Sequence, residues 1–91
     1  MVFKGFEDFD IEIDPCEPIY IMSVVSRLVH IPEWTIRILD KEGVVSPKRK
    51  KGKKRLYCQK DLKRLEYVHY LMSEKGVNIK GIKLILEIEE K

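Results

Sequence analysis

The stretch from Lys48 to Arg55 constrains the fold most, because seven of its eight residues are cationic and it lies between two helical patterns. A run of like charge is usually a solvated tail, but two valines precede this one and Leu56 and Tyr57 follow it. Gly52, in the middle of the run, suits a tight turn that needs a positive φ. The stretch is therefore predicted to form the tip of a short β-hairpin. Its crowded cations indicate a polyanionic partner, most simply a nucleic-acid backbone.

Length and charge narrow the class of protein. A chain of 91 residues is one small domain with a modest core and no room for a cleft between lobes, so an enzyme is not expected. Residues 1–17 carry one lysine against six acidic residues, a net charge of −5, whereas residues 18–91 carry 17 basic against nine acidic residues, a net charge of +8. A basic body behind an acidic leader points toward nucleic acid.

The N-terminal sequence has neither a basic start nor a long apolar run, so no signal peptide or membrane span is predicted and a cytoplasmic location is expected. Cys16 and Cys58 are too few and too far apart for a disulfide framework, which agrees with a reducing compartment. The acidic leader, residues 1–17, is expected to be either flexible or a short strand. Residues 9–14 alternate between apolar and polar types, while Phe3, Phe6 and Phe9 also fit a helical spacing.

Residues 18–91 are predicted to form the folded domain, beginning with two short helices. Ser23 is a plausible N-cap for the first, with Val24, Val25 and Leu28 on its apolar face. Pro32 disfavours helix at the residue before it and suits the start of the next helix, which is expected from about Glu33 to Lys41 and to end near Gly43. Two short helices joined by a tight turn form a helix-turn-helix.

Two more helices are predicted after the basic hairpin. One starts near Gln59 and ends at Gly76, and the other is capped by Asn78. The apolar stripe of the first comprises Leu62, Leu65, Val68, His69 and Met72; the second carries Ile79, Ile82, Ile85, Leu86 and Ile88. The expected fold is therefore mainly α: a winged helix-turn-helix with a short β-hairpin wing and two trailing helices.

The second helix is the element expected to enter a DNA major groove. A helical wheel directs Ile36 and Leu39 toward the first helix, and it leaves Arg37 outside as either a DNA contact or an ordinary surface arginine. Two interpretations stay open for Trp34 and Ile38, which are either core residues or contacts to sugar edges and thymine methyl groups. The predicted DNA contacts are Trp34, Thr35, Arg37, Ile38 and Lys41 on the helix, with Lys50, Lys51, Lys53, Lys54, Arg55 and Tyr57 in the wing.

The chain resembles the MerR-type family of bacterial transcription regulators. The residues that carry the resemblance are Thr35-Ile36-Arg37-Ile38-Leu39-Asp40-Lys41-Glu42-Gly43-Val44, then Pro47, Arg55-Leu56-Tyr57-Cys58 and Asp61-Leu62. Within the family it is most similar to the heat-shock repressor branch, on Glu17-Pro18-Ile19-Tyr20-Ile21-Met22-Ser23-Val24 and Lys75-Gly76-Val77-Asn78-Ile79-Lys80-Gly81-Ile82-Lys83. The resemblance implies binding to inverted repeats upstream of chaperone operons, repression, and a DnaK-type chaperone as co-repressor.

Three residues depart from the family pattern. Leu39 replaces an aromatic residue, His30 stands where the family has a turn glycine, and Cys58 replaces a serine N-cap. Cys58 should cap weakly, at a cost of roughly 1 kcal/mol. Its place at a helix start beside cationic residues also favours the thiolate, which makes it a candidate redox sensor. His30, His69, Cys16 and Cys58 lack the spacing of metal ligands, and no cofactor is expected.

The fourth helix is richer in apolar residues than one core-facing stripe requires. MerR-type proteins generally dimerise through a long helix after the fourth, but the printed sequence ends at Lys91, and no coiled-coil heptads are expected there. Leu84 and Ile88 are therefore predicted to contact a second copy in a weak homodimer, or a partner protein. Two rival functions stay open: an architectural or excisionase-like DNA-binding protein, and a small basic RNA-binding protein, which is disfavoured because the aromatic residues form no stacking platform.

Overall fold

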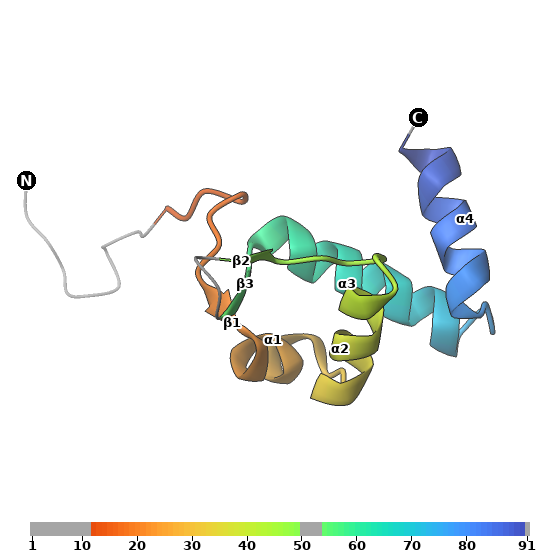
Figure 1. The fold of residues 1–91 in the computed structure, drawn as a ribbon, viewed down its shortest axis with the longest axis horizontal. Coiled ribbons are helices and arrows are strands. Elements are labelled where there is room, and N and C mark those ends of the chain that lie inside the picture. The colour runs from red at the N-terminus through yellow and green to blue at the C-terminus, as the bar shows by residue number, and fades with distance from the viewer. Residues whose placement is uncertain (1–11, 50–53, 91) are drawn as a thin grey trace, which may run out of the picture.

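A short strand, a helix-turn-helix, a β-hairpin and a pair of trailing helices follow one another along the chain (Figure 1). The computed structural model describes residues 12–49 and 54–90. The helices are α1 (Met22–Val29), α2 (Glu33–Lys41), α3 (Gln59–Ser73) and α4 (Ile79–Glu89), and the strands are β1 (Tyr20–Ile21), β2 (Lys48–Arg49) and β3 (Arg55–Tyr57). This architecture confirms the predicted fold class, a mainly α winged helix-turn-helix.

The turn between α1 and α2 is set by His30 and Pro32. His30 adopts a left-handed conformation, with φ at 57°, and its N–H donates to the carbonyl of Ser26. This is the conformation for which a glycine would be the usual choice. The Ser26 hydroxyl donates to the carbonyl of Ile31 at 2.6 Å, and the N–H groups of Thr35 and Ile36 donate to the carbonyl of Pro32. The turn thus closes through hydrogen bonds at both of its ends, and α2 has the predicted bounds.

The start of α1 differs from the prediction. The helix begins at Met22, its N-cap is Ile21 without a side-chain cap, and Ser23 lies inside the first turn. The buried residues are Met22, Val25 and Val29, whereas Val24 and Leu28 are 40% and 54% exposed. The predicted apolar face is therefore wrong for Val24 and Leu28. The physical reason is that β1 pairs with β3 and runs directly into α1, so the sheet fixes where the helix starts and how it is rotated.

The three strands form an antiparallel sheet in the order β1-β3-β2. Tyr20 pairs with Tyr57 and Ile21 with Leu56 on one side of β3, and Lys48 pairs with Leu56 on the other. The hairpin of β2 and β3 was predicted, but β1 was not, because two residues are too short to show an alternating pattern. The predicted tip with Gly52 lies outside the described residues.

The described part of the acidic leader is attached to α3. The Asp14 carboxylate accepts from the N–H of Cys16 at 2.8 Å, which forms a turn, and the carbonyl of Pro15 accepts from the N–H of Lys60 at 3.1 Å. Lys60 lies in the first turn of α3, where backbone N–H groups have no partner within the helix itself. Residues 12–14 are not in a strand, which was one of the two alternatives for the leader. The three phenylalanines of the leader lie outside the described residues.

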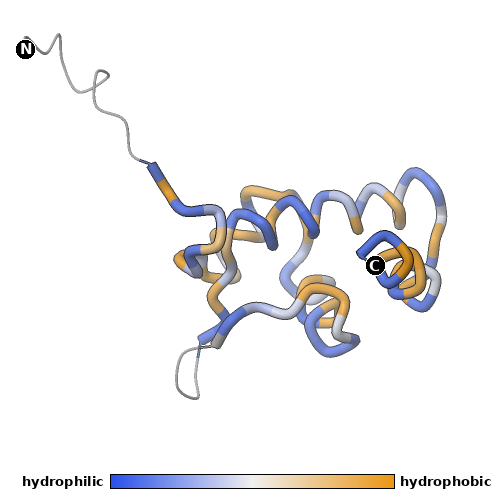
Figure 2. Tube along the Cα trace, turned by 90° about the horizontal axis from the view of Figure 1, so that it is seen from above, coloured by the Kyte–Doolittle hydropathy of each residue, from blue (hydrophilic) through white to orange (hydrophobic). Residues whose placement is uncertain are grey.

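One core joins all four helices to the sheet. Its fully buried members are Val25, Ile31, Ile36, Leu39, Val45, Tyr57, Leu65, Val68 and Ile82. Figure 2 shows hydrophobic and hydrophilic positions alternating along the described part of the chain. α3 ends at Ser73, three residues before the predicted end at Gly76, which has a φ of 65° in the connection to α4. Asn78 caps α4 as predicted, by accepting from the N–H of Gly81 at 2.8 Å.

The end of α4 is bonded to the middle of α3. Arg64 donates to Glu90, and the Tyr67 hydroxyl donates to Glu89 at 2.7 Å. Arg64 also donates to the carbonyl of Val44 at 3.0 Å. These contacts hold α4 against α3 and against the segment that follows α2. Among the described residues, no helix is long and apolar enough to cross a membrane.

Candidate nucleic-acid interface

The outer face of α2 is one continuous exposed stripe. Trp34 is 64% and Ile38 37% exposed, and Arg37 and Lys41 are exposed beside them. Residues three and four positions apart lie on the same side of a helix, which brings these four together. The opposite side carries Ile36 and Leu39, both fully buried as predicted. The interpretation of Trp34 and Ile38 as core residues is therefore wrong, and both face solvent with the two cations.

Thr35 lies at the edge of this stripe. Its side chain is partly buried, and its N–H donates to the carbonyl of Pro32 in the first turn of α2. The hydroxyl is thus next to the exposed face without standing at its centre. Of the five residues predicted on α2, four form the stripe and Thr35 borders it.

Arg37 has an acidic neighbour on its own helix. Its Nη2 lies 3.5 Å from Oε1 of Glu33, one turn earlier, and both side chains are exposed, at 56% and 43%. An exposed pair of this kind is worth only about 0.3–0.5 kcal/mol. Arg37 can therefore exchange Glu33 for a phosphate or a base edge at little cost in free energy.

Arg55 connects the sheet to α2. Its Nε donates to Oδ2 of Asp40 at 2.6 Å, and only 5% of the Asp40 side chain is exposed, against 37% of Arg55. Burial of a carboxylate without a partner is expensive, so this contact is part of the architecture. Arg55 was predicted only as a DNA contact of the wing. The signal in the sequence was Asp40 itself, an acidic residue next to Leu39 on the buried side of α2.

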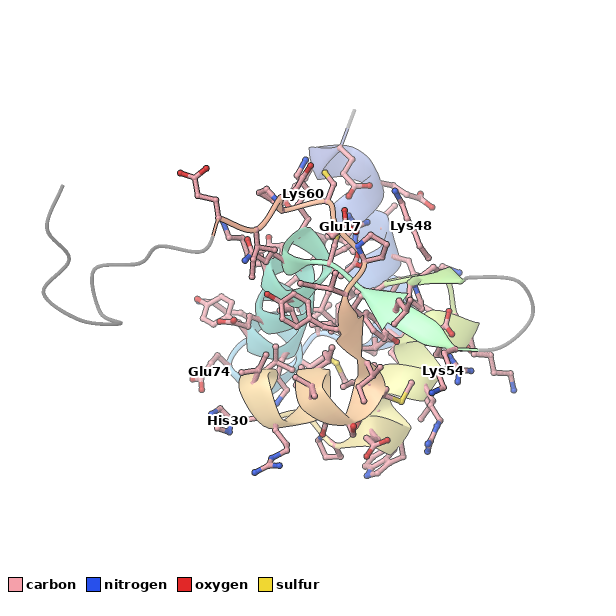
Figure 3. All side chains as sticks on the ribbon, turned by 90° about the vertical axis from the view of Figure 1, so that its left-hand side faces the viewer. Glu17, His30, Lys48, Lys54, Lys60 and Glu74 are labelled. Carbon is pink, nitrogen blue, oxygen red and sulfur yellow. The ribbon has the colours of Figure 1, made fainter. Side chains whose placement is uncertain are left out.

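A shallow hollow of about 270 Å³ lies between the start of α1, α2 and the hairpin. It is lined by Ile21, Met22, Glu33, Arg37, Lys54 and Arg55. Three cations, one from α2 and two from the hairpin, thus meet at one depression with a single carboxylate. In Figure 3, Lys54 and Lys48 lie on the side of the hairpin, whereas His30 and Glu74 lie on the opposite side. The structure therefore brings Arg37, Lys54 and Arg55 together at one hollow, and their contact with DNA stays a prediction.

Other predicted site residues are placed differently. Tyr57 is fully buried in the core, so the expectation that its side chain contacts DNA is wrong; its place in the middle strand of the sheet turns the ring inward. Lys50, Lys51 and Lys53 lie outside the described residues. Their contribution to the interface stays a prediction.

Cys58 precedes α3 at the predicted N-cap position. It is 9% exposed, and its N–H donates to the Asp61 carboxylate at 3.0 Å. Asp61 therefore supplies one half of a capping box. Burial limits the access of oxidants to Cys58, whereas Cys16 is exposed. No three His, Cys, Asp or Glu side chains gather as metal ligands within the part of the chain that the structure describes.

The sequence comparisons agree with this arrangement. The family model described as "MerR HTH family regulatory protein" matches residues 20–88. The chain belongs to this MerR family. It is 37% identical over 78 residues to HspR of Streptomyces coelicolor, whose name marks it as a heat shock protein, and this match covers 86% of the chain and 52% of HspR. It is 32% identical over 73 residues to the HTH-type transcriptional regulator GlnR of Bacillus anthracis, covering 80% of the chain and 56% of GlnR.

The same identity relates the chain to GlnR of Bacillus cereus. The chain spans about half the length of the curated relatives that it matches. In this chain, the family match runs from β1 to α4 and so includes the helix-turn-helix, the wing and the trailing helices. The shared segment is therefore the one that carries the candidate interface.

Proposed function

We propose that this chain is a sequence-specific double-stranded DNA-binding unit of a transcriptional regulator. The observation that carries the proposal is the exposed stripe of α2 next to a cationic hairpin that Arg55 and Asp40 hold in place. A helix of this kind can enter a major groove while a neighbouring hairpin reaches the flanking backbone. The MerR helix-turn-helix match supports this role.

The proposed contacts divide by chemistry. Arg37 addresses a base edge, with Thr35 and Lys41 on bases or phosphates, because guanidinium and hydroxyl groups match the donors and acceptors of the major groove. Trp34 and Ile38 supply apolar contacts to sugars or thymine methyl groups. Lys50, Lys51, Lys53 and Lys54 bind the flanking backbone or the minor groove. Arg55 both orients the wing and adds positive charge to the hollow beside Arg37.

We further propose that the regulator represses stress or chaperone genes, since HspR, a relative that is 37% identical to the chain, carries a heat-shock name. An inverted repeat as the target site and a DnaK-type co-repressor follow from the resemblance to the heat-shock branch, and a cytoplasmic location follows from the N-terminal sequence and the two cysteines. The co-repressor is tested by adding purified DnaK to the chain bound to its DNA site. Tighter binding in the presence of DnaK supports it, and unchanged affinity contradicts it.

Selection of bound duplexes from a random library tests the proposed function as a whole. The proposal predicts an enriched motif, and its symmetry reports how many copies bind. Competition by folded RNA should fail where an equal amount of duplex succeeds, because single-stranded and folded RNA recognition needs stacking surfaces. Binding to all duplexes without an enriched motif would favour an architectural protein that bends DNA instead.

A further inference from the structure

Two segments that are distant in sequence meet where the leader joins the sheet. The N–H of Ile19 donates to the carbonyl of Tyr57 at 3.0 Å, and the N–H of Lys60 donates to the carbonyl of Pro15 at 3.1 Å. The leader and the junction between β3 and α3 are thus bonded to each other at two points. Figure 3 shows Glu17 and Lys60 at the same end of the molecule, in agreement with these bonds.

Each of these segments carries one cysteine. Cys16 comes directly after Pro15, and Cys58 comes two residues before Lys60. Because the bond between Pro15 and Lys60 joins positions so near to the cysteines, the Cα atoms of Cys16 and Cys58 lie within about 11 Å of each other. A disulfide needs Cα atoms no more than about 7 Å apart. A movement of a few ångströms by the leader therefore brings the two cysteines into bonding range.

The two thiols differ in their access to solvent. Cys16 is exposed, whereas Cys58 is buried, with 9% of its surface exposed. The leader also runs beside Cys58, because its two bonds are made to residues on either side of that cysteine. A dissolved oxidant therefore reaches Cys16 first. An exposed cysteine next to a second, resolving cysteine is the arrangement in which a sulfenic acid is converted to a disulfide.

The charges around Cys16 select the oxidant. Glu12, Asp14 and Glu17 are all exposed and lie close to Cys16 in the chain, and the Asp14 carboxylate accepts from the N–H of Cys16 at 2.8 Å. These carboxylates repel an anionic oxidant such as glutathione disulfide. They do not repel hydrogen peroxide, which carries no charge.

We propose that hydrogen peroxide drives formation of a disulfide between Cys16 and Cys58 of one chain. The Cys16 thiolate attacks a peroxide oxygen, the O–O bond breaks, and the released hydroxide takes up the thiol proton to form water, which leaves Cys16 as a sulfenic acid. The Cys58 sulfur then attacks the Cys16 sulfur, the S–O bond breaks, and the oxygen leaves as water with the proton of Cys58. Two thiols thus give two electrons to one peroxide, which becomes two waters. The proposal does not depend on DNA binding.

A competition between the second thiol and dimedone tests this step. The reduced 91-residue chain is treated with hydrogen peroxide in the presence of dimedone, which traps sulfenic acids, and the products are measured by intact mass and peptide mapping. Wild type should lose two hydrogens and give a linked pair of peptides that contain Cys16 and Cys58. Cys58→Ser should instead give the dimedone adduct of Cys16. Glutathione disulfide should oxidise the wild-type chain more slowly than peroxide does.

The matched control moves the exposed thiol away from Cys58. The double variant Cys16→Ser/Ser73→Cys keeps one exposed and one buried cysteine, but α3 separates them by about 22 Å. Its ratio of disulfide to dimedone adduct should be at least about tenfold lower than that of wild type, because the effective concentration of the second thiol is lost. Circular dichroism checks that every variant keeps its helices.

Three results would overturn the proposal. The first is a wild-type chain in which peroxide leaves both thiols free or gives only the dimedone adduct of Cys16. The second is a disulfide that joins two chains instead of two cysteines of one chain. The third is a ratio of disulfide to adduct as high in the double variant as in wild type, since proximity would then play no part.

Discussion

Arg55 and Asp40 join the wing to the second helix of the helix-turn-helix, with Arg55 Nε 2.6 Å from Asp40 Oδ2. The carboxylate is buried and the guanidinium is partly exposed beside Arg37 and Lys54. This contact ties strand β3 to α2. The contact therefore helps to set the distance between the exposed stripe of α2 and the wing.

The first prediction concerns this contact. Arg55→Ala should lower the free energy of unfolding by about 2–3 kcal/mol, because it removes the guanidinium donor from a buried carboxylate. Urea denaturation measures the change. Arg55→Lys keeps the charge but lacks the Nε donor, so its stability should fall between those of wild type and Arg55→Ala. Lys54→Ala, an exposed neighbour, is the control and should stay within about 0.5 kcal/mol of wild type. Equal stability of Arg55→Ala and Lys54→Ala would contradict a structural role for the pair.

The second prediction uses the salt dependence of DNA affinity to distinguish the wing lysines from other exposed lysines. Replacing Lys51, Lys53 and Lys54 by Gln should weaken binding to all duplexes. It should also reduce the slope of log affinity against log salt by up to about 0.9 for each phosphate that the wing no longer neutralises. The matched variant replaces three other exposed lysines by Gln. They are Lys63 of α3, Lys75 in the connection after it and Lys83 of α4. This variant should leave the slope unchanged. Equal slopes for the two triple variants would remove the wing from the interface.

The third prediction distinguishes a structural role of Cys58 at the start of α3 from a role as a redox sensor. Cys58→Ser should raise the free energy of unfolding by roughly 0.5–1 kcal/mol, because a hydroxyl caps a helix better than a thiol. In the folded protein a thiol reagent should modify the exposed Cys16 quickly and the buried Cys58 slowly. Fast modification of Cys58, together with DNA binding that disappears on peroxide treatment, would instead support the sensor hypothesis.

The fourth prediction concerns pH and the contact between α3 and α4. The hydrogen bond from Arg64 lowers the pKa of Glu90 below its usual value of 4.5. Its contribution to stability is therefore present above that value and is lost as the pH falls through the lowered pKa. The hydrogen bond to Glu89 raises the pKa of Tyr67 above its usual value of 10.0. That contribution is present below pH 10.0 and is lost as the pH rises through the raised pKa.

Thermal melts of variants check these two windows. Glu90→Gln should remove a small stabilisation at neutral pH and have no effect in strong acid. Tyr67→Phe should act at neutral pH and lose its effect in strong alkali. A pH-independent effect of either substitution would contradict the assignment.

Local signals predicted much of this fold. Pro32 and Gly43 indicated the correct bounds of α2, and Asn78 marked the start of α4, because turn and cap chemistry depends on neighbouring residues. The rotation of α1 was missed because the pairing of β1 with β3 sets it, and that pairing is a tertiary contact between distant segments. The inward ring of Tyr57 and the bond from Arg55 to Asp40 were missed for the same reason. A run of charged residues predicts a charged surface, but it does not predict which residue each of them pairs with.

Arg37 provides the most direct test of the central claim that α2 reads DNA sequence. The measurement is the affinity of wild type and Arg37→Ala for the selected duplex and for duplexes changed at each base pair. The account predicts a loss of roughly 1–3 kcal/mol on the selected site, with discrimination relaxed at one base pair. An equal loss on matched and mismatched duplexes, or no loss at all, would contradict base recognition by this helix.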